Sequence, residues 1–129
     1  MQARLSVLLA AVVLGICVPV NAHHSFAAVF DVDSSIAVSG TVTKVEWMNP
    51  HAWIYIDVED DDGGSENWAF ELGSPNGLMR RGWTRKSVQV GDVVSVTGYL
   101  ARDGSLRGNV RSIVLANGTE LTGMSNRDK

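Results

Sequence analysis

The sequence contains little that could cross-link or anchor a small protein: one cysteine and three histidines in 129 residues. A single cysteine, Cys17, excludes an internal disulfide, so the core must be stable without one. Fourteen Asp and Glu against eleven Lys and Arg give a net charge of −3. This acidic balance argues against nucleic acid or an anionic membrane surface as a partner, because both attract basic patches. The only long apolar run is at residues 5–18, so no later segment is expected to anchor the chain in a membrane.

Motifs of common enzymes are also missing. Ser74 stands one place too early for the Gly-x-Ser-x-Gly nucleophile elbow. The sequence has no phosphate-binding loop and no Cys/His array of the zinc type. The acidic run at residues 59–62 has Asp62 where a calcium-binding EF-hand loop requires glycine, so we predict a hairpin turn. The sequence therefore favours a binding protein over an enzyme.

The first 22 residues have the organisation of a secretory signal peptide. Arg4 precedes the apolar run at residues 5–18, which is too short to span a bilayer. Ala22 is the small residue expected just before a cleavage site. A lipoprotein signal ending at Cys17 is the alternative, but the bulky Ile16 stands where a small residue normally precedes a lipidated cysteine. We expect cleavage after Ala22, which removes Cys17 and leaves a mature protein that begins at His23.

Beyond the signal peptide, we expect an N-terminal segment at 23–35, one domain at 36–121 and a polar tail at 122–129. Alternating apolar residues predict strands at 36–47, 51–59, 68–72, 93–100 and 108–115. A change of parity near Thr43 and Lys44 indicates a β-bulge in the first strand. The predicted core contains Val42, Ile54, Ile56, Phe70, Val94 and Val96.

A short helix is predicted between the third and fourth strands. Ser74 is a favourable N-cap, Pro75 suits the first helical position, and Gly82 ends the helix, which we place at 75–81. Three strands, a short helix and two strands form the β-β-β-α-β-β order of an OB-like, five-stranded Greek-key barrel. The predicted fold class is therefore all-β with one short helix, with an irregular β-sandwich as the alternative.

The positions of the histidines point to a metal. His23 and His24 would be the first two residues of the mature protein, and His51 begins a strand. A free N-terminal histidine chelates a metal through its α-amine and its ring Nδ1, and one further imidazole completes a set of three nitrogens. Cu(II) suits such tetragonal nitrogen ligation and heads the affinity order for it. We expect copper to bind His23 and His51, with His24 as an alternative ligand.

The positions of the histidines can also be explained without a metal. A histidine at a new terminus can be incidental, and His51 can be a hydrogen-bonded residue at a strand end. Asp31, Asp33 and Met48 are additional candidate ligands, although each suits an ordinary surface or packing role better.

Trp53 and Tyr55 share the predicted outer face of the second strand with His51. On an OB-fold this region often binds ligands, and aromatic side chains there can stack on the faces of flat ligands. Trp47 and Trp68 are expected to pack at the core instead. The basic residues around Trp83 are expected to form a solvated surface.

Several motifs together resemble those of a family of small exported bacterial proteins that is known only as a domain of unknown function. The resemblance implies a bacterial, periplasmic or secreted protein, without an activity. The mature N-terminal His23 is also similar to the histidine brace of periplasmic copper carriers and copper-dependent polysaccharide monooxygenases, in its ligand type and not in its fold. The family motifs are His23-His24-Ser25-Phe26, Gly40-Thr41-Val42, Asn49-Pro50-His51, Trp68-Ala69-Phe70-Glu71 and Gly73-Ser74-Pro75-Asn76.

Three functional hypotheses remain open at this stage. The leading one is a periplasmic copper-binding protein that acts in copper delivery, storage or tolerance. The second is a metal-free OB-type module that binds a small ligand or another envelope protein through Trp53 and Tyr55. The third is a copper oxidase or monooxygenase, for which so small a barrel offers little substrate surface.

Overall fold

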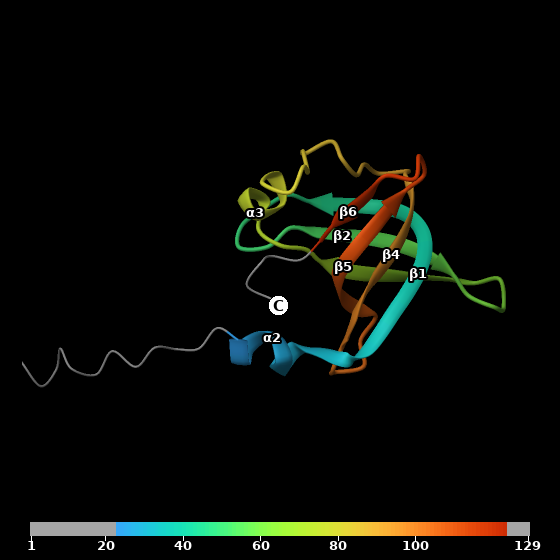
Figure 1. The fold of residues 1–129 in the computed structure, drawn as a ribbon. Coiled ribbons are helices and arrows are strands. Elements are labelled where there is room, and N and C mark those ends of the chain that lie inside the picture. The colour runs from blue at the N-terminus through green and yellow to red at the C-terminus, as the bar shows by residue number, and fades with distance from the viewer. Residues whose placement is uncertain (1–22, 124–129) are drawn as a thin grey trace, which may run out of the picture.

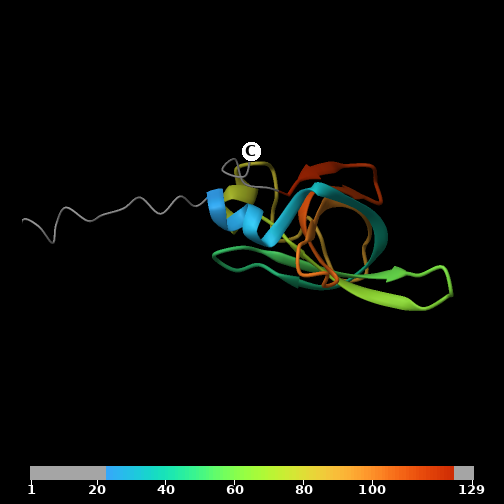
Figure 2. The same cartoon turned by 90° about the horizontal axis from the view of Figure 1, so that it is seen from below.

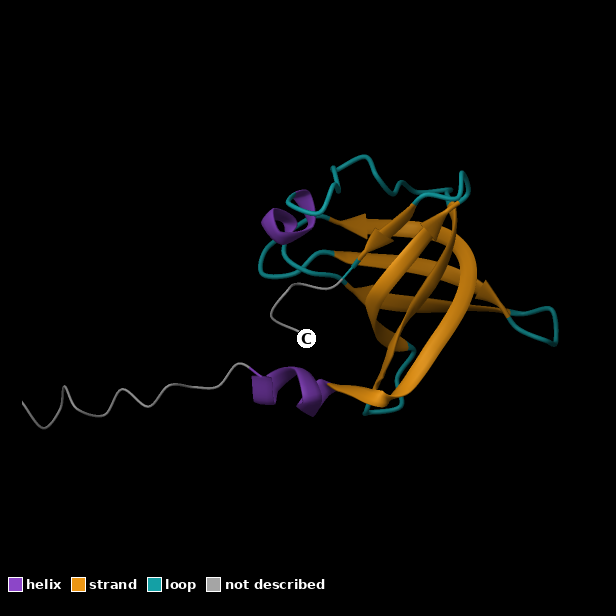
Figure 3. Cartoon of the chain, in the orientation of Figure 1, coloured by secondary structure: helices purple, strands orange, loops and turns teal. Residues whose placement is uncertain are grey.

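The computed structural model describes residues 23–123, with side chains from Phe26 onward. The predicted signal peptide at 1–22 and residues 124–129 lie outside this range, as do the side chains of His23 and His24. The strands β1 to β5 and the helix α3 between β3 and β4 confirm the predicted all-β class with a short helix (Figure 3). The elements are α2 (His23–Val29), β1 (Phe30–Glu46), β2 (Trp53–Glu59), β3 (Ser65–Glu71), α3 (Pro75–Met79), β4 (Val93–Ala101), β5 (Arg107–Leu115) and β6 (Glu120–Thr122).

Five of the strands form a closed ring. Hydrogen bonds join them in the order β3-β2-β1-β4-β5, and a parallel pairing between β3 and β5 closes the circle. The other pairings in the ring are antiparallel. β6 extends the sheet beyond β5. Figure 1 shows the long, bent β1 passing from the lower half of the ring to the upper half.

β1 takes part in two halves of the ring because it bends. Its residues from Phe30 to Thr41 pair with β4, and those from Thr41 to Glu46 pair with β2. The register between β1 and β2 shifts between Val42 and Lys44, which confirms the predicted bulge. A bulge increases the local bend of a strand. The irregular residues near Thr43 therefore allow one strand to serve both sides of the ring.

The core lies inside the ring. All six core residues predicted from the alternation are buried, which confirms the strand parity. Phe70 and Trp68 stack with ring centroids 5.9 Å apart, and Leu78 of α3 adds an apolar side chain at one end. Ser74 caps α3 as expected, because its Oγ accepts a hydrogen bond from the Gly77 N–H at 3.2 Å. No helix in residues 23–123 is long and apolar enough to cross a membrane.

The structure corrects the predicted start of the first strand and adds a strand near the C-terminal end. The first strand is predicted at 36–47, but β1 starts at Phe30, directly after α2. The early part of β1 extends because it pairs with the end of β4, where Phe30 lies opposite Ala101. A sixth strand, β6, was not predicted and continues to Thr122, inside the expected polar tail. It forms because β5 offers it a free edge.

Candidate functional site

The site begins at the entrance to β2, where the backbone places His51 on the outside of the ring. The Ala52 N–H donates to the Gly73 carbonyl at 3.1 Å, and the Leu72 N–H donates to the Ala52 carbonyl at 2.8 Å. These bonds continue the β2–β3 ladder by one step past the first strand residue, Trp53. Ala52 is buried and His51 is exposed. The ladder therefore holds His51 beside the end of β3, immediately after the cis Asn49–Pro50 peptide.

The ring of His51 contacts the carboxylate of Glu71 at the end of β3. The contact joins the ring Nδ1 of His51 to Oε1 of Glu71. The carboxylate side chain is 15% exposed and the imidazole 49% exposed. When Nδ1 carries the proton and donates it to a carboxylate, the lone pair of the ring lies on Nε2. Metal-binding histidines commonly have this arrangement, in which a carboxylate fixes the ring orientation and makes the ligating nitrogen more basic.

The N-terminal helix lies at the same end of the ring as His51. Figures 1 and 2 both show α2, α3 and the connection between β1 and β2 at this end. The side chains of His23 and His24 are outside the described part, so the three-histidine metal site stays a prediction. Among the side chains that are described, no group of three or more His, Cys, Asp or Glu residues is placed to hold a metal ion.

The outer face of β2 carries Trp53 and Tyr55 beside His51, as the alternation predicts. The hydroxyl of Tyr55 donates to Glu46 at 3.1 Å, and the Lys44 ammonium lies 2.5 Å from the same carboxylate and 4.9 Å from the centre of the Tyr55 ring. Hydrogen bonds from Lys44 and Tyr55 lower the pKa of Glu46, whereas burial, followed by the nearby Glu46 carboxylate, raises the pKa of Tyr55. Lys44 thus occupies one face of Tyr55, so Trp53 is the better stacking surface of the two.

The other three tryptophans have packing roles. Trp47 and Trp68 are partly buried against the core, as expected. Trp83 is 3% exposed, and its Nε1–H donates to the Thr122 carbonyl at 2.9 Å. The rings of Trp47 and Trp83 lie 6.5 Å apart and cover one end of the core. These residues therefore offer no ligand platform.

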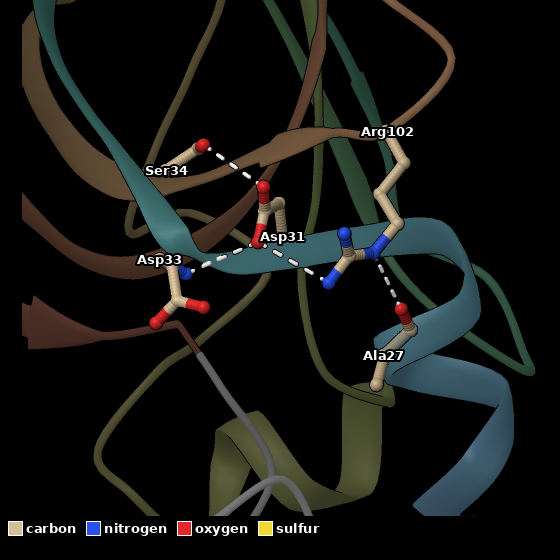
Figure 4. Close-up of polar contacts among 5 residues, drawn as sticks. All are labelled: Ala27, Asp31, Asp33, Ser34 and Arg102. Atoms are coloured by element: carbon tan, nitrogen blue, oxygen red, sulfur yellow. Dashed lines mark hydrogen bonds and ion pairs between the residues drawn. The ribbon is translucent and has the colours of Figure 1, made fainter.

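The additional ligands considered from the sequence are not assembled into a site. Asp31 already accepts hydrogen bonds from the Ser34 hydroxyl and the Asp33 N–H, and it pairs with Arg102 (Figure 4). These bonds, with the Arg102 charge as a smaller cause, lower the pKa of Asp31. Asp33 and Met48 are exposed.

Two residues of this region, Glu71 and Asn109, were not predicted as site residues, although Glu71 is the last residue of a family motif. They lie opposite each other where β3 meets β5, and Asn109 also lies opposite Tyr99 of β4. Asn109 is 4% exposed, and its Oδ1 has no hydrogen-bond partner. A buried polar atom without a partner is rare and often marks a site with a further role. Only strand register brings these residues together, so no local sequence pattern could reveal them.

Comparison with curated proteins finds no match to this sequence. The model of one protein family, described as a family of unknown function (DUF6152), matches residues 11–111. The matched region includes β1 to β4, the His51–Glu71 pair and Asn109. The chain therefore belongs to the DUF6152 family of unknown function.

Proposed function

We propose that this protein is exported, is cleaved before His23 and binds Cu(II) in the bacterial periplasm. His23 would ligate the ion through its α-amine and ring, and Nε2 of His51 would be the third nitrogen ligand. His24 is the alternative ligand at the terminus. Binding without turnover suits delivery, storage or tolerance of copper.

The observation that supports this proposal most strongly is the contact between His51 Nδ1 and Glu71. It orients the imidazole and leaves Nε2 as the nitrogen with the lone pair. The His51 side chain is half exposed, so a metal can reach it from solvent.

The chemistry of the ligands favours copper over harder ions. An α-amine and two imidazoles make a set of three nitrogens, and copper(II) binds such sets more tightly than the other divalent first-row metals. The reference pKa is about 7.7–8.0 for an α-amine and about 6.5 for histidine. Displacing these protons near neutral pH therefore costs little free energy. Calcium and magnesium prefer oxygen ligands and would compete poorly here.

The first experiment is intact mass and metal analysis of the protein purified from the periplasm of an expressing bacterium. A mature chain that begins at His23 and carries copper is the expected result. An N-terminus elsewhere, or a lipid on Cys17, would remove the basis of the proposal.

The second experiment measures Cu(II) affinity against a competing chelator. We compare the mature wild type with His51→Ala, Glu71→Gln and a variant with one alanine added before His23. Loss of an outer carboxylate partner typically weakens metal binding about 10–100-fold, which is the expectation for Glu71→Gln. The other two variants should lose at least as much, because each removes a ligand. Equal affinity of wild type and His51→Ala would mean that copper binds at the N-terminus alone, without His51, and would contradict the proposal.

A second candidate function is binding of a flat, positively charged ligand over Trp53. Trp53 is partly buried on the outer face of the ring, and its cross-strand neighbours are Glu46 in β1 and Glu71 in β3. An indole face between two carboxylates suits a cation. Trp53→Ala separates the two functions, since it should abolish binding of such a ligand and leave Cu(II) affinity nearly unchanged. Oxygen consumption that depends on a reductant would instead indicate a copper oxidase.

A further inference from the structure

The junction between α2 and β1 is held by Arg102, the first residue of the turn after β4. Its Nε–H donates to the Ala27 carbonyl in the last turn of α2 at 2.7 Å. Its Nη2 lies 3.2 Å from Oδ1 of Asp31, which is the second residue of β1 (Figure 4). The backbone N–H of Arg102 also donates to the Val29 carbonyl at 2.9 Å. One residue thus connects the end of the helix, the start of the strand and the end of β4.

Aromatic packing supports α2 independently of Arg102. The ring of Phe26 lies 5.3 Å from Phe30 and meets Tyr99 of β4 edge-on at 6.4 Å, centre to centre. Phe26 thus packs the helix against the buried Phe30 of β1 and against β4. The position of α2 depends on these two sets of contacts.

A helix as short as α2 is not stable without such contacts. Its seven residues fall well below the length at which isolated helices persist in water. The carbonyls of a last helical turn have no partners within the helix. Arg102 supplies donors to two of them, the carbonyls of Ala27 and Val29. Its planar group bridges two acceptors in fixed directions, which a lysine ammonium cannot do from a single nitrogen.

We propose that Arg102 is a positioning residue for the metal site: by fixing α2, it holds the mature N-terminus where His23 and His51 can bind one ion. This inference rests on the proposed copper function. α2 spans about 10 Å from its first residue to β1, so a loose junction would let the α-amine sweep a wide volume. Preorganisation of this kind improves affinity by lowering the entropy lost on binding.

The test combines Cu(II) competition titrations with electron paramagnetic resonance, which reports the nitrogens bound to the ion. The proteins are mature wild type, Arg102→Gln, Arg102→Lys, His51→Ala and the Arg102→Gln/His51→Ala double variant. Arg85→Gln is the matched control, because Arg85 is exposed in the segment after α3 and its loss removes the same charge.

Arg102→Gln should lose about tenfold in affinity, the size of a typical outer-partner effect, and should show fewer bound nitrogens. Arg102→Lys should resemble Arg102→Gln, because lysine keeps the charge but cannot contact the Ala27 carbonyl and Asp31 together. The double variant should bind no more weakly than His51→Ala, because a terminus that cannot use His51 gains nothing from being positioned. Hydrogen exchange of the α2 amides should speed up while the urea midpoint of the ring stays close to wild type.

The possible failures are distinct. If His51→Ala weakens binding but Arg102→Gln binds like Arg85→Gln, the positioning role is wrong and the proposed function stands. If His51→Ala binds like wild type, both fall. If Arg102→Gln weakens binding equally with and without His51, its effect does not pass through the shared site, and the positioning role is again wrong. Should Arg102→Gln fail to fold, Phe26→Ala loosens α2 from the other side, and the same outcomes apply.

Discussion

Replacing Asn109 by leucine is expected to make the protein more stable, whereas most substitutions of a buried residue make a protein less stable. Asn109 is 4% exposed, and its Oδ1 lacks a hydrogen-bond partner. A buried polar atom without a partner costs about 1–3 kcal/mol of desolvation that folding does not recover. Leucine has nearly the same shape, has no polar atom to desolvate and has a better propensity for strands. We therefore expect the free energy of unfolding to rise by about 1 kcal/mol at least.

The measurement is urea unfolding followed by tryptophan fluorescence. For a domain of this size, about 1 kcal/mol moves the urea midpoint by roughly 0.3–1 M. Asn67→Leu is the comparison, since it makes the same change in a strand at an exposed asparagine whose side chain is hydrogen-bonded. Asn67 donates to Asp57 at 2.7 Å and to Thr43 at 3.0 Å, so this variant should be less stable than wild type.

The two leucine variants distinguish removal of an unpaired buried atom from a general gain in strand propensity. If only strand propensity mattered, both would gain stability, because the scale of about 1 kcal/mol applies to each. Destabilisation by Asn109→Leu would refute the reasoning, since it would mean that the side chain contributes more than its unpaired atom costs. If Asn109→Leu is more stable and also binds copper less well, the protein keeps Asn109 for function and not for folding.

Gly98→Ala should destabilise the protein by about 1–3 kcal/mol in urea, because the added Cβ would lie 1.9 Å from a backbone oxygen of β5; a wild-type midpoint would contradict the packing. The Asp31 carboxyl should titrate by NMR below the reference value of about 3.9, and Ser34→Ala should raise that pKa more than Arg102→Gln does. Since the folded pKa is lowered, the contribution of Asp31 to stability is present above pH 4 and is lost as the pH falls through the folded pKa. Tyr55→Phe should raise the pKa of Glu46, because it removes one of the two hydrogen bonds that lower it.

Much of the ring could be predicted because its strands alternate. Ile54 and Ile56 are buried while Trp53 and Tyr55 lie outside, as the two-residue period requires. The bulge was visible because it shifts this period within a single strand. These features depend on neighbouring residues, so a local pattern contains them.

The parts that could not be predicted depend on contacts between distant segments. α2 is too short to be stable by itself, and its existence rests on Phe26 against Tyr99 and on Arg102. The sequence gives no sign that Glu71 contacts His51, because only the β2–β3 ladder brings the two residues together. The alternation also missed the early part of β1, because Asp31, Val32 and Asp33 interrupt it where the register is irregular.

The pairing of β1 with β4 has a consequence for how the chain must fold. β1 pairs with β4 from Phe30 opposite Ala101 to Thr41 opposite Val93, so its longest set of partners comes from the far end of the sequence. Until residues 93–101 arrive, the first three strands can form only an open meander whose apolar face, with Ile54 and Phe70, has nothing to cover it. Pairings between such distant residues make folding slow compared with helical proteins of similar size. A chain cut before β4 should therefore aggregate and not fold in part, and the protein gains its structure only when the last strands are present.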